Sequence, residues 1–225
     1  MNLTINTIVV PQGPEYQAVR RGLAQAQSKK KNIQVISIPI GTKDVLQTLV
    51  NRSFEFINPQ QVLILGLCGS LSSEYSVGDR LLYQSCCNSQ GDSLDLDREL
   101  TMAIQQKMPL NLVTGLTSNR PICLAKEKFK LGQEYAAAVV DMEGYGYIKE
   151  LQRQRMSVAM LRIVSDGVKG NIPDLSQAID EGGNLNSRQM AIAFIRQPCA
   201  SIRLVKGSLA GLKQLQQVTQ ELFSR

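Results

Sequence analysis

Short apolar runs alternate along the chain with segments whose apolar residues recur at helical spacing. The first run covers residues 7–10 and is stopped by a Pro-Gln-Gly-Pro segment. Four apolar residues then follow at intervals of three or four, namely Tyr16, Val19, Leu23 and Ala26. This pattern predicts a strand followed by a helix. A second strand is predicted over residues 33–38, and a second helix over residues 43–56.

The rest of the chain continues the alternation. Residues 61–65 form a continuous apolar run, typical of a parallel strand buried on both faces, and residues 158–164 form the clearest strand. Further strands are predicted over residues 78–83, 110–116 and 136–140. The polar segment 85–97 is predicted to be a loop, and helices are predicted from about Glu143 and from Ser208 onward. Strands that alternate with helices predict an α/β fold of three layers, α/β/α, with helices on both faces of a sheet.

Length and composition favour a single domain, residues 1–225. The chain has 225 residues, of which 43% are hydrophobic, and no Pro/Gly/Ser-rich linker interrupts it. The first residues lack the basic and apolar regions of a secretory signal, and no segment approaches the roughly 20 apolar residues of a membrane helix. Five cysteines without paired spacing fit reduced thiols better than a disulfide framework. We therefore expect a cytoplasmic protein without membrane insertion.

Charge and residue usage exclude several function classes. The net charge is +6, but the basic residues are scattered and Trp is absent, so a solvated surface explains the charge better than nucleic-acid binding. The chain has no histidine, and the adjacent Cys86 and Cys87 have no second pair to complete a zinc site. We expect neither a metal nor another cofactor.

Three acidic residues follow predicted strands. Glu15 comes after the first strand, Glu143 after the strand at 136–140, and Asp166 after the strand at 158–164. A turn of small residues, 66–70, follows the strand at 61–65. Ligands of α/β sheets bind beyond the carboxyl ends of the strands, which makes these positions candidates for a site. Each acid taken singly also fits the N-terminal turn of a helix.

Together these segments resemble the nucleoside phosphorylase and nucleosidase superfamily, which includes methylthioadenosine/S-adenosylhomocysteine nucleosidases and purine nucleoside phosphorylases. The matching motifs are Gly66-Leu67-Cys68-Gly69-Ser70-Leu71 with Gly78-Asp79, Val140-Asp141-Met142-Glu143, and Leu161-Arg162-Ile163-Val164-Ser165-Asp166. The resemblance spans about residues 7–170 and implies a phosphorylase/hydrolase-like fold with a mixed, mostly parallel central sheet. Three further segments are similar to the hopanoid-associated phosphorylases: Ser118-Asn119-Arg120-Pro121-Ile122, Lys126-Glu127-Lys128, and the C-terminal stretch from Arg196 to Leu215.

The resemblance implies cleavage of the N-glycosidic bond of a purine, in particular adenine, nucleoside. Asp166 would protonate the departing base, for which it must hold a proton near neutral pH, and Ser165 and Ser118 would help to bind that base. Glu143 would accept hydrogen bonds from the ribose hydroxyls, with Met142 packed against the sugar. Arg162 is expected to be a structural ion-pair partner. The loop beside the nucleophile would contain Gly66, Cys68, Gly69 and Ser70.

The nucleophile distinguishes two chemistries. The phosphate-binding arginine and serine of the family's phosphorylases fall at Ile64 and Leu67, which cannot bind an anion, whereas Glu15 falls where the nucleosidases activate water. Water is therefore favoured, although backbone N–H groups, Arg20 or Arg21 would be available to phosphate. A phosphorylase, an adenine-removing enzyme of hopanoid biosynthesis and an inactive nucleoside-binding protein stay open as alternatives. The family resemblance also implies a homo-oligomer. The short segment between Asp79 and Ser118 and the lack of histidine depart from the family pattern.

Overall fold

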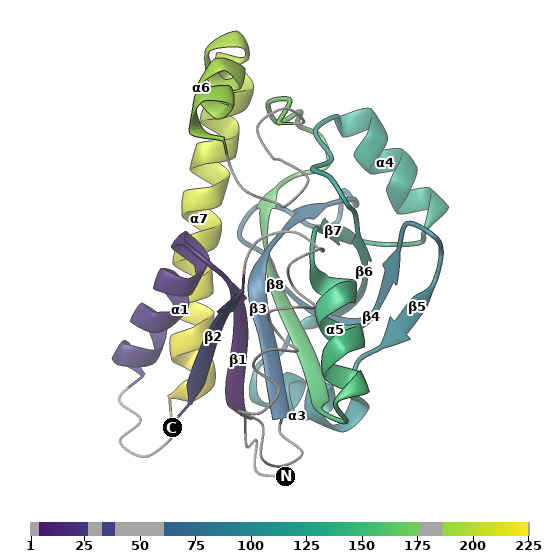
Figure 1. Cartoon of the computed structure of the whole chain (residues 1–225), viewed down its shortest axis with the longest axis vertical. Helices are drawn as coiled ribbons and strands as arrows, with labels where there is room; N and C mark the ends of the chain where they lie inside the picture. Colours follow the sequence, from purple (N-terminus) through teal and green to yellow (C-terminus); the bar gives the residue numbers. More distant parts are fainter. Residues whose placement is uncertain (1–4, 27–32, 39–60, 176–185, 225) are drawn as a thin grey trace.

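A mixed eight-stranded sheet forms the centre of the computed structural model, which describes residues 5–26, 33–38, 61–175 and 186–224 (Figure 1). Its strands are β1 (Ile5–Pro11), β2 (Gln34–Ile38), β3 (Gln61–Ser70), β4 (Arg80–Asn88), β5 (Ser93–Asp95), β6 (Asn111–Thr117), β7 (Val139–Asp141) and β8 (Ser157–Asp166). The strand order is β2-β1-β3-β7-β6-β4-β5, and β8 pairs with both β3 and β4. Five of the eight strand pairs described are parallel, so the sheet is mostly parallel, as expected.

Helices cover both faces of this sheet. The helices are α1 (Pro14–Gln25), α3 (Arg98–Lys107), α4 (Ala125–Glu134), α5 (Gly144–Arg153), α6 (Ser187–Arg196) and α7 (Pro198–Phe223). One apolar core lies between the sheet and α1, α3 and α7, and a second contains the buried side chains of α5. The predicted three-layer α/β/α fold is thus confirmed. In Figure 1, α4 and α6 lie at the upper end, toward which β3 and β8 run.

Most predicted strands are found, and two of them extend further than their apolar runs. β3 continues from the apolar residues 61–65 through the glycine turn to Ser70, and β8 continues to Asp166. Both extensions are held by the parallel pairing of β3 with β8, which places Gly69 opposite Asp166. The predicted helix over residues 43–56 lies outside the described residues. Among the described helices, none is long and apolar enough to cross a membrane.

The predicted loop over residues 85–97 is wrong. β4 continues to Asn88, and β5 pairs with it in an antiparallel hairpin. Polar residues are accommodated in β4 because they have partners on the neighbouring strand. The hydroxyl groups of Ser85 on β4 and Thr114 on β6 are hydrogen-bonded at 3.0 Å. Cys86 and Cys87 are buried within it. The end of β4 was therefore not predicted, because its polar residues, which pair across strands, resemble loop residues in the sequence.

The observed ends of other strands and helices also differ from the predicted ends. The strand predicted over 136–140 covers only Val139–Asp141, because Ala136 has a positive φ of 47° and belongs to the turn after α4. β4 begins at Arg80, after Gly78 has turned the chain with a φ of 97°. α7 begins at Pro198 and not at Ser208. Helices α3, α4 and α6 were not predicted from the sequence.

Candidate active site

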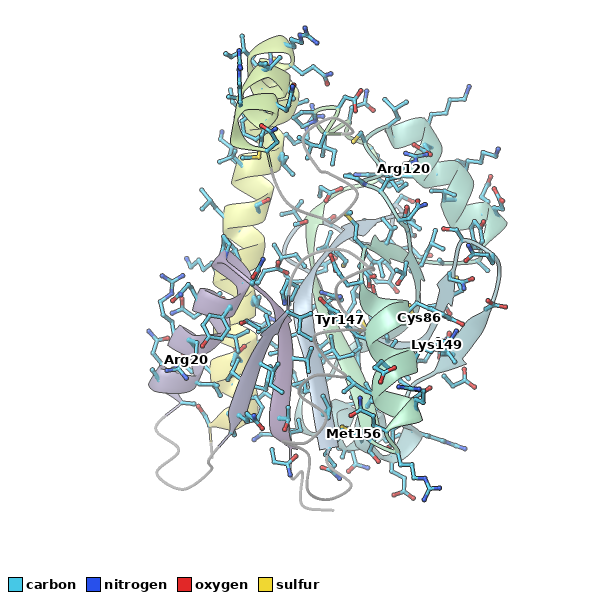
Figure 2. The ribbon with its side chains drawn as sticks, viewed as in Figure 1. Arg20, Cys86, Arg120, Tyr147, Lys149 and Met156 are labelled. Carbon is cyan, nitrogen blue, oxygen red and sulfur yellow. The ribbon has the colours of Figure 1, made fainter. Side chains whose placement is uncertain are left out.

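A cavity of about 190 Å³ opens where β1, β3, β7 and β8 end. Its lining residues are Glu15, Leu67, Cys68, Gly69, Arg120, Pro121, Ile122, Val140, Asp141, Met142, Glu143, Ser165, Asp166 and Ile172. Figure 2 shows Arg120, one of them, beside α4 at the upper end of the molecule. The three acidic residues that follow predicted strands, Glu15, Glu143 and Asp166, therefore converge on one cavity.

Glu15 lies in the first turn of α1, directly after Pro14, which begins the helix. Its Oε1 accepts a hydrogen bond from the backbone N–H of Leu67 at 2.7 Å. Burial raises the pKa of Glu15 from 4.5 to about 7, although Arg162 and the Leu67 N–H act in the opposite direction. A carboxyl group that titrates near neutral pH can exchange protons with a reacting group efficiently.

Asp141, at the end of β7, holds the start of α5 in place. Its carboxylate accepts hydrogen bonds from Tyr83 Oη at 3.0 Å and Thr117 Oγ1 at 2.8 Å. It also accepts from the backbone N–H groups of Glu143, at 3.2 Å, and Gly144, at 2.8 Å. These contacts satisfy donors that a helix N-terminus leaves free. Asp141 therefore fixes the backbone that carries the Glu143 side chain into the cavity.

Arg162 lies on β8 beneath the cavity and is fully buried. Its Nε is 3.6 Å from Asp141 Oδ2, and its Nη2 is 3.6 Å from Glu143 Oε2. Burial opposes its charge, but Asp141 and Glu143 more than offset this effect and raise the pKa of the guanidinium. Arg162 is thus an ion-pair partner, as predicted. None of its side-chain nitrogens has a hydrogen-bond partner among the described residues.

Asp166, the last residue of β8, is held from two sides. Ser165 Oγ lies 3.1 Å from Asp166 Oδ1, and Lys128 Nζ donates to Asp166 Oδ2. Helix α7 passes directly behind this strand end, because Gly207 leaves no side chain in the way. A Cβ atom at Gly207 would lie 2.0 Å from the carbonyl oxygen of Ser165. Asp166 is therefore positioned by α4, β8 and α7 together.

The other residues predicted for the site divide into two groups. Met142, Cys68, Gly69 and Ser165 line the cavity, whereas Gly66, Ser70 and Ser118 are absent from its lining. Ser70 Oγ donates to the Ser72 carbonyl at 2.6 Å, and Ser118 Oγ donates to the Arg120 carbonyl at 2.9 Å. Ser70 and Ser118 thus shape turns next to the cavity and do not face it. Gly66 packs against Arg162.

Several residues of the site were not predicted from the sequence. Lys128 belongs to the Lys126-Glu127-Lys128 segment that is similar to the hopanoid-associated phosphorylases, but the sequence predicts neither its helix nor a role for its side chain. Asp141 belongs to a recognised motif but was given no role of its own. Arg120, Pro121 and Ile122 come from the segment similar to the hopanoid-associated phosphorylases and form part of the cavity wall. Among the described residues, no cluster of His, Cys, Asp or Glu is arranged to hold a metal ion.

Comparisons with known proteins agree with this architecture. A family model described as the phosphorylase superfamily matches residues 11–196. No curated protein matches the chain. The native structure of futalosine hydrolase from Helicobacter pylori is similar, with a TM-score of 0.68 at 16% identity over 96% of this chain and 97% of that one.

Two nucleosidase structures are similar to a comparable degree. The 5′-methylthioadenosine/S-adenosylhomocysteine nucleosidase of Helicobacter pylori, with butyl-thio-DADMe-Immucillin-A, has a TM-score of 0.65 at 17% identity, covering 97% of this chain and 98% of that one. The 5′-methylthioadenosine nucleosidase of Arabidopsis thaliana, in apo form, has a TM-score of 0.66 at 12% identity, covering 99% and 93%. At these identities the similarity establishes the fold.

Proposed function

Since this chain belongs to the phosphorylase superfamily, and thus to the enzymes that include nucleoside hydrolases and phosphorylases, we propose that it cleaves the N-glycosidic bond of a purine nucleoside with water. One observation carries the proposal. Glu15, with a pKa of about 7, shares a cavity with Glu143 and Asp166. This arrangement offers a base for water, an acceptor for a sugar and an acid for a leaving group within one site.

Glu143 is the proposed sugar-binding residue. It is buried at the N-terminus of α5, where Asp141 fixes its backbone and Arg162 lies beside its carboxylate. A carboxylate in this position accepts hydrogen bonds from the ribose hydroxyl groups. Its negative charge also stabilises the positive charge that develops on the sugar as the bond to the base breaks. Met142 would pack against the sugar ring from the adjacent cavity wall.

Glu15 is the proposed base that activates water. In its ionised form it takes a proton from a water molecule, which then attacks the anomeric carbon of the sugar. Arg162 lies in the same cluster of charges, and its positive charge favours the ionised form of Glu15.

Asp166 is the proposed residue that contacts the base. Its carboxyl group lines the cavity, and its orientation is set by Ser165 and Lys128. As the glycosidic bond breaks, negative charge accumulates on the purine ring. A proton delivered through Asp166 to a ring nitrogen would neutralise that charge, and such general acid help is typically worth about 10²–10⁴-fold in rate.

The charges of the cavity favour water over phosphate. Asp141 and Glu143 contribute carboxylates next to the buried guanidinium of Arg162, and Glu15 adds a third above its pKa of about 7. The other two charged residues of the lining are each paired with an opposite charge, Arg120 with Glu127 and Asp166 with Lys128. The backbone N–H of Leu67, a candidate anion donor, already binds Glu15. Arg20 lies on the solvent-facing side of α1 (Figure 2). A phosphate dianion would therefore meet net negative charge here.

Incubation with adenosine, 5′-methylthioadenosine and futalosine, with and without phosphate, tests the proposal. We expect release of free base and of the sugar itself, at a rate that phosphate does not change. Glu15→Gln should abolish turnover, whereas the matched variant Glu134→Gln, at an exposed position on α4, should retain it. Sugar phosphate as the product would establish the phosphorylase alternative. Absence of base release from all three nucleosides would contradict the cleavage of a free nucleoside and favour the alternatives, a lipid-linked substrate or a binding protein.

We also propose that the substrate is an adenine nucleoside and that the protein is a cytoplasmic homo-oligomer. All five cysteines are free thiols, which fits the reducing compartment expected from the sequence.

A further inference from the structure

In helix α4 a charged side chain is buried and the aromatic side chain next to it is exposed, which is the reverse of the usual pattern. Lys128 is 0% exposed, whereas the next residue, Phe129, is 57% exposed. Burying an ammonium group costs several kcal/mol unless it is paired, and exposing an aromatic ring forfeits the gain of its burial. A helix free to rotate would reverse the two. Positions where a protein departs from the expected pattern in this way are often functional.

Lys128 is directed at the end of β8. Its Nζ donates to Asp166 Oδ2 and, at 3.2 Å, to the carbonyl oxygen of Gly167. Asp166 lines the cavity, whereas Lys128 is not among the lining residues. The ammonium group therefore reaches the cavity only through the carboxylate. This makes Lys128 a residue that acts behind Asp166, without touching a bound nucleoside.

From this arrangement we infer that Lys128 supplies, through Asp166, the proton that the departing base takes up; the inference rests on the proposed function. As the C–N bond breaks, its electron pair moves onto the purine. The Asp166 carboxylate takes a proton from Lys128 Nζ, and Asp166 passes a proton on to a purine nitrogen. The base leaves neutral, Asp166 is again a carboxylate, and Lys128 is a neutral amine.

The cycle closes without any further reactant. Water loses a proton to Glu15 as it attacks the sugar, so Glu15 ends the step protonated. Exchange with solvent then removes that proton from Glu15 and returns one to Lys128. The sum is nucleoside plus water giving sugar plus neutral base. The proton transfer runs along the contact between Lys128 Nζ and Asp166 Oδ2.

A substrate whose leaving group needs no proton distinguishes proton supply by Lys128 from a purely structural role of Lys128. p-Nitrophenyl riboside offers the same sugar to Glu143 and Glu15 but releases p-nitrophenolate, a stable anion. In Lys128→Met we expect kcat for the purine nucleoside to fall by about 10²-fold or more, with KM little changed, whereas kcat for p-nitrophenyl riboside changes by less than about tenfold. Turnover of p-nitrophenyl riboside also shows that the variant is folded.

Lys128→Gln provides the second variant. Its amide keeps an N–H donor toward Asp166 and Gly167 but has no proton to transfer, so it should lose purine cleavage as Lys128→Met does. Lys130→Met, at an exposed position of the same helix, is the matched control and should match the wild type on both substrates.

Three results would overturn the inference. These are recovery of purine cleavage in Lys128→Gln, an equal fall for both substrates, and no fall at all in a folded Lys128→Met. Failure of the proposed function is recognised separately, because the wild-type protein would then release neither base nor p-nitrophenolate.

Discussion

Arg162 Nη1 fills the space beside Gly66, so that a Cβ atom at Gly66 would lie 1.9 Å from that nitrogen. Arg162 cannot swing away, because it is fully buried and is held between Asp141 and Glu143. We predict that Gly66→Ala destabilises the protein by about 1–3 kcal/mol, the usual cost of overpacking a core. Displacement of Arg162 should also disturb Glu143 and lower nucleoside cleavage.

Urea unfolding of Gly66→Ala measures the first effect, and base release measures the second. Gly146→Ala is the matched control, since a Cβ atom there meets nothing within 4 Å. Gly146 lies inside α5, where alanine is favoured over glycine by about 0.5–1 kcal/mol, so this control should be as stable as the wild type or more so. Equal stability of the two variants would show that Arg162 adapts without cost.

The parts of the site that follow from parallel strand ends were predictable, whereas those that depend on packing were not. Glu15 and Asp166 follow β1 and β8, which are both parallel to β3, so the ends of these strands lie at one edge of the sheet. Glu143 follows β7, which is antiparallel to the end of β3, so its position was indicated by the motif that it belongs to and not by the direction of its strand. Lys128 reaches Asp166 from 38 residues away along the chain, on a helix whose orientation the sequence does not reveal. Its burial beside an exposed Phe129 contradicts the pattern on which helix predictions rely.

The errors in the sheet have a related cause. Apolar runs identified β3 and β8, but β4 continues through Ser85, whose partner Thr114 lies on another strand. A polar residue that finds its partner across the sheet looks like a loop residue in the sequence alone. Ser118 shows the same limit within the site, since its hydroxyl group binds the Arg120 backbone and not the cavity.

Replacement of Asp141 should destabilise the protein. In Asp141→Asn the carboxylate beside Arg162 is lost. The buried positive charge of Arg162 then has one fewer negative charge near it. Breaking a buried ion pair from one side typically costs about 3–5 kcal/mol, and we expect a loss of that size in urea unfolding. Asp95→Asn, at an exposed position, is the control and should stay within about 0.5 kcal/mol of the wild type. A loss below about 1 kcal/mol in Asp141→Asn would contradict this account.

The raised pKa of Glu15 predicts a dependence of stability on pH. Between pH 4.5 and about 7 the unfolded chain has released the Glu15 proton while the folded protein retains it. The folded state therefore binds more protons, and this residue's contribution to stability falls as the pH rises through that window. Glu15→Gln removes the titration. Its Tm relative to the wild type should rise by a few degrees between pH 5 and pH 8, measured by thermal unfolding. A difference in Tm that is constant with pH would show that Glu15 titrates normally.

The same group predicts the pH dependence of the reaction. Glu15 must be ionised to take a proton from water, so kcat/KM should rise tenfold per pH unit on the acidic side and level off above about pH 7. Initial rates of base release at low substrate concentration, from about pH 5.5 to about pH 8.5, measure this profile. The acidic limb reports the free enzyme, in which burial and Arg162 act on Glu15 without a bound ligand. A profile that is flat across pH 7, or that falls as the pH rises toward 7, would show that an ionised Glu15 is not the base that activates water.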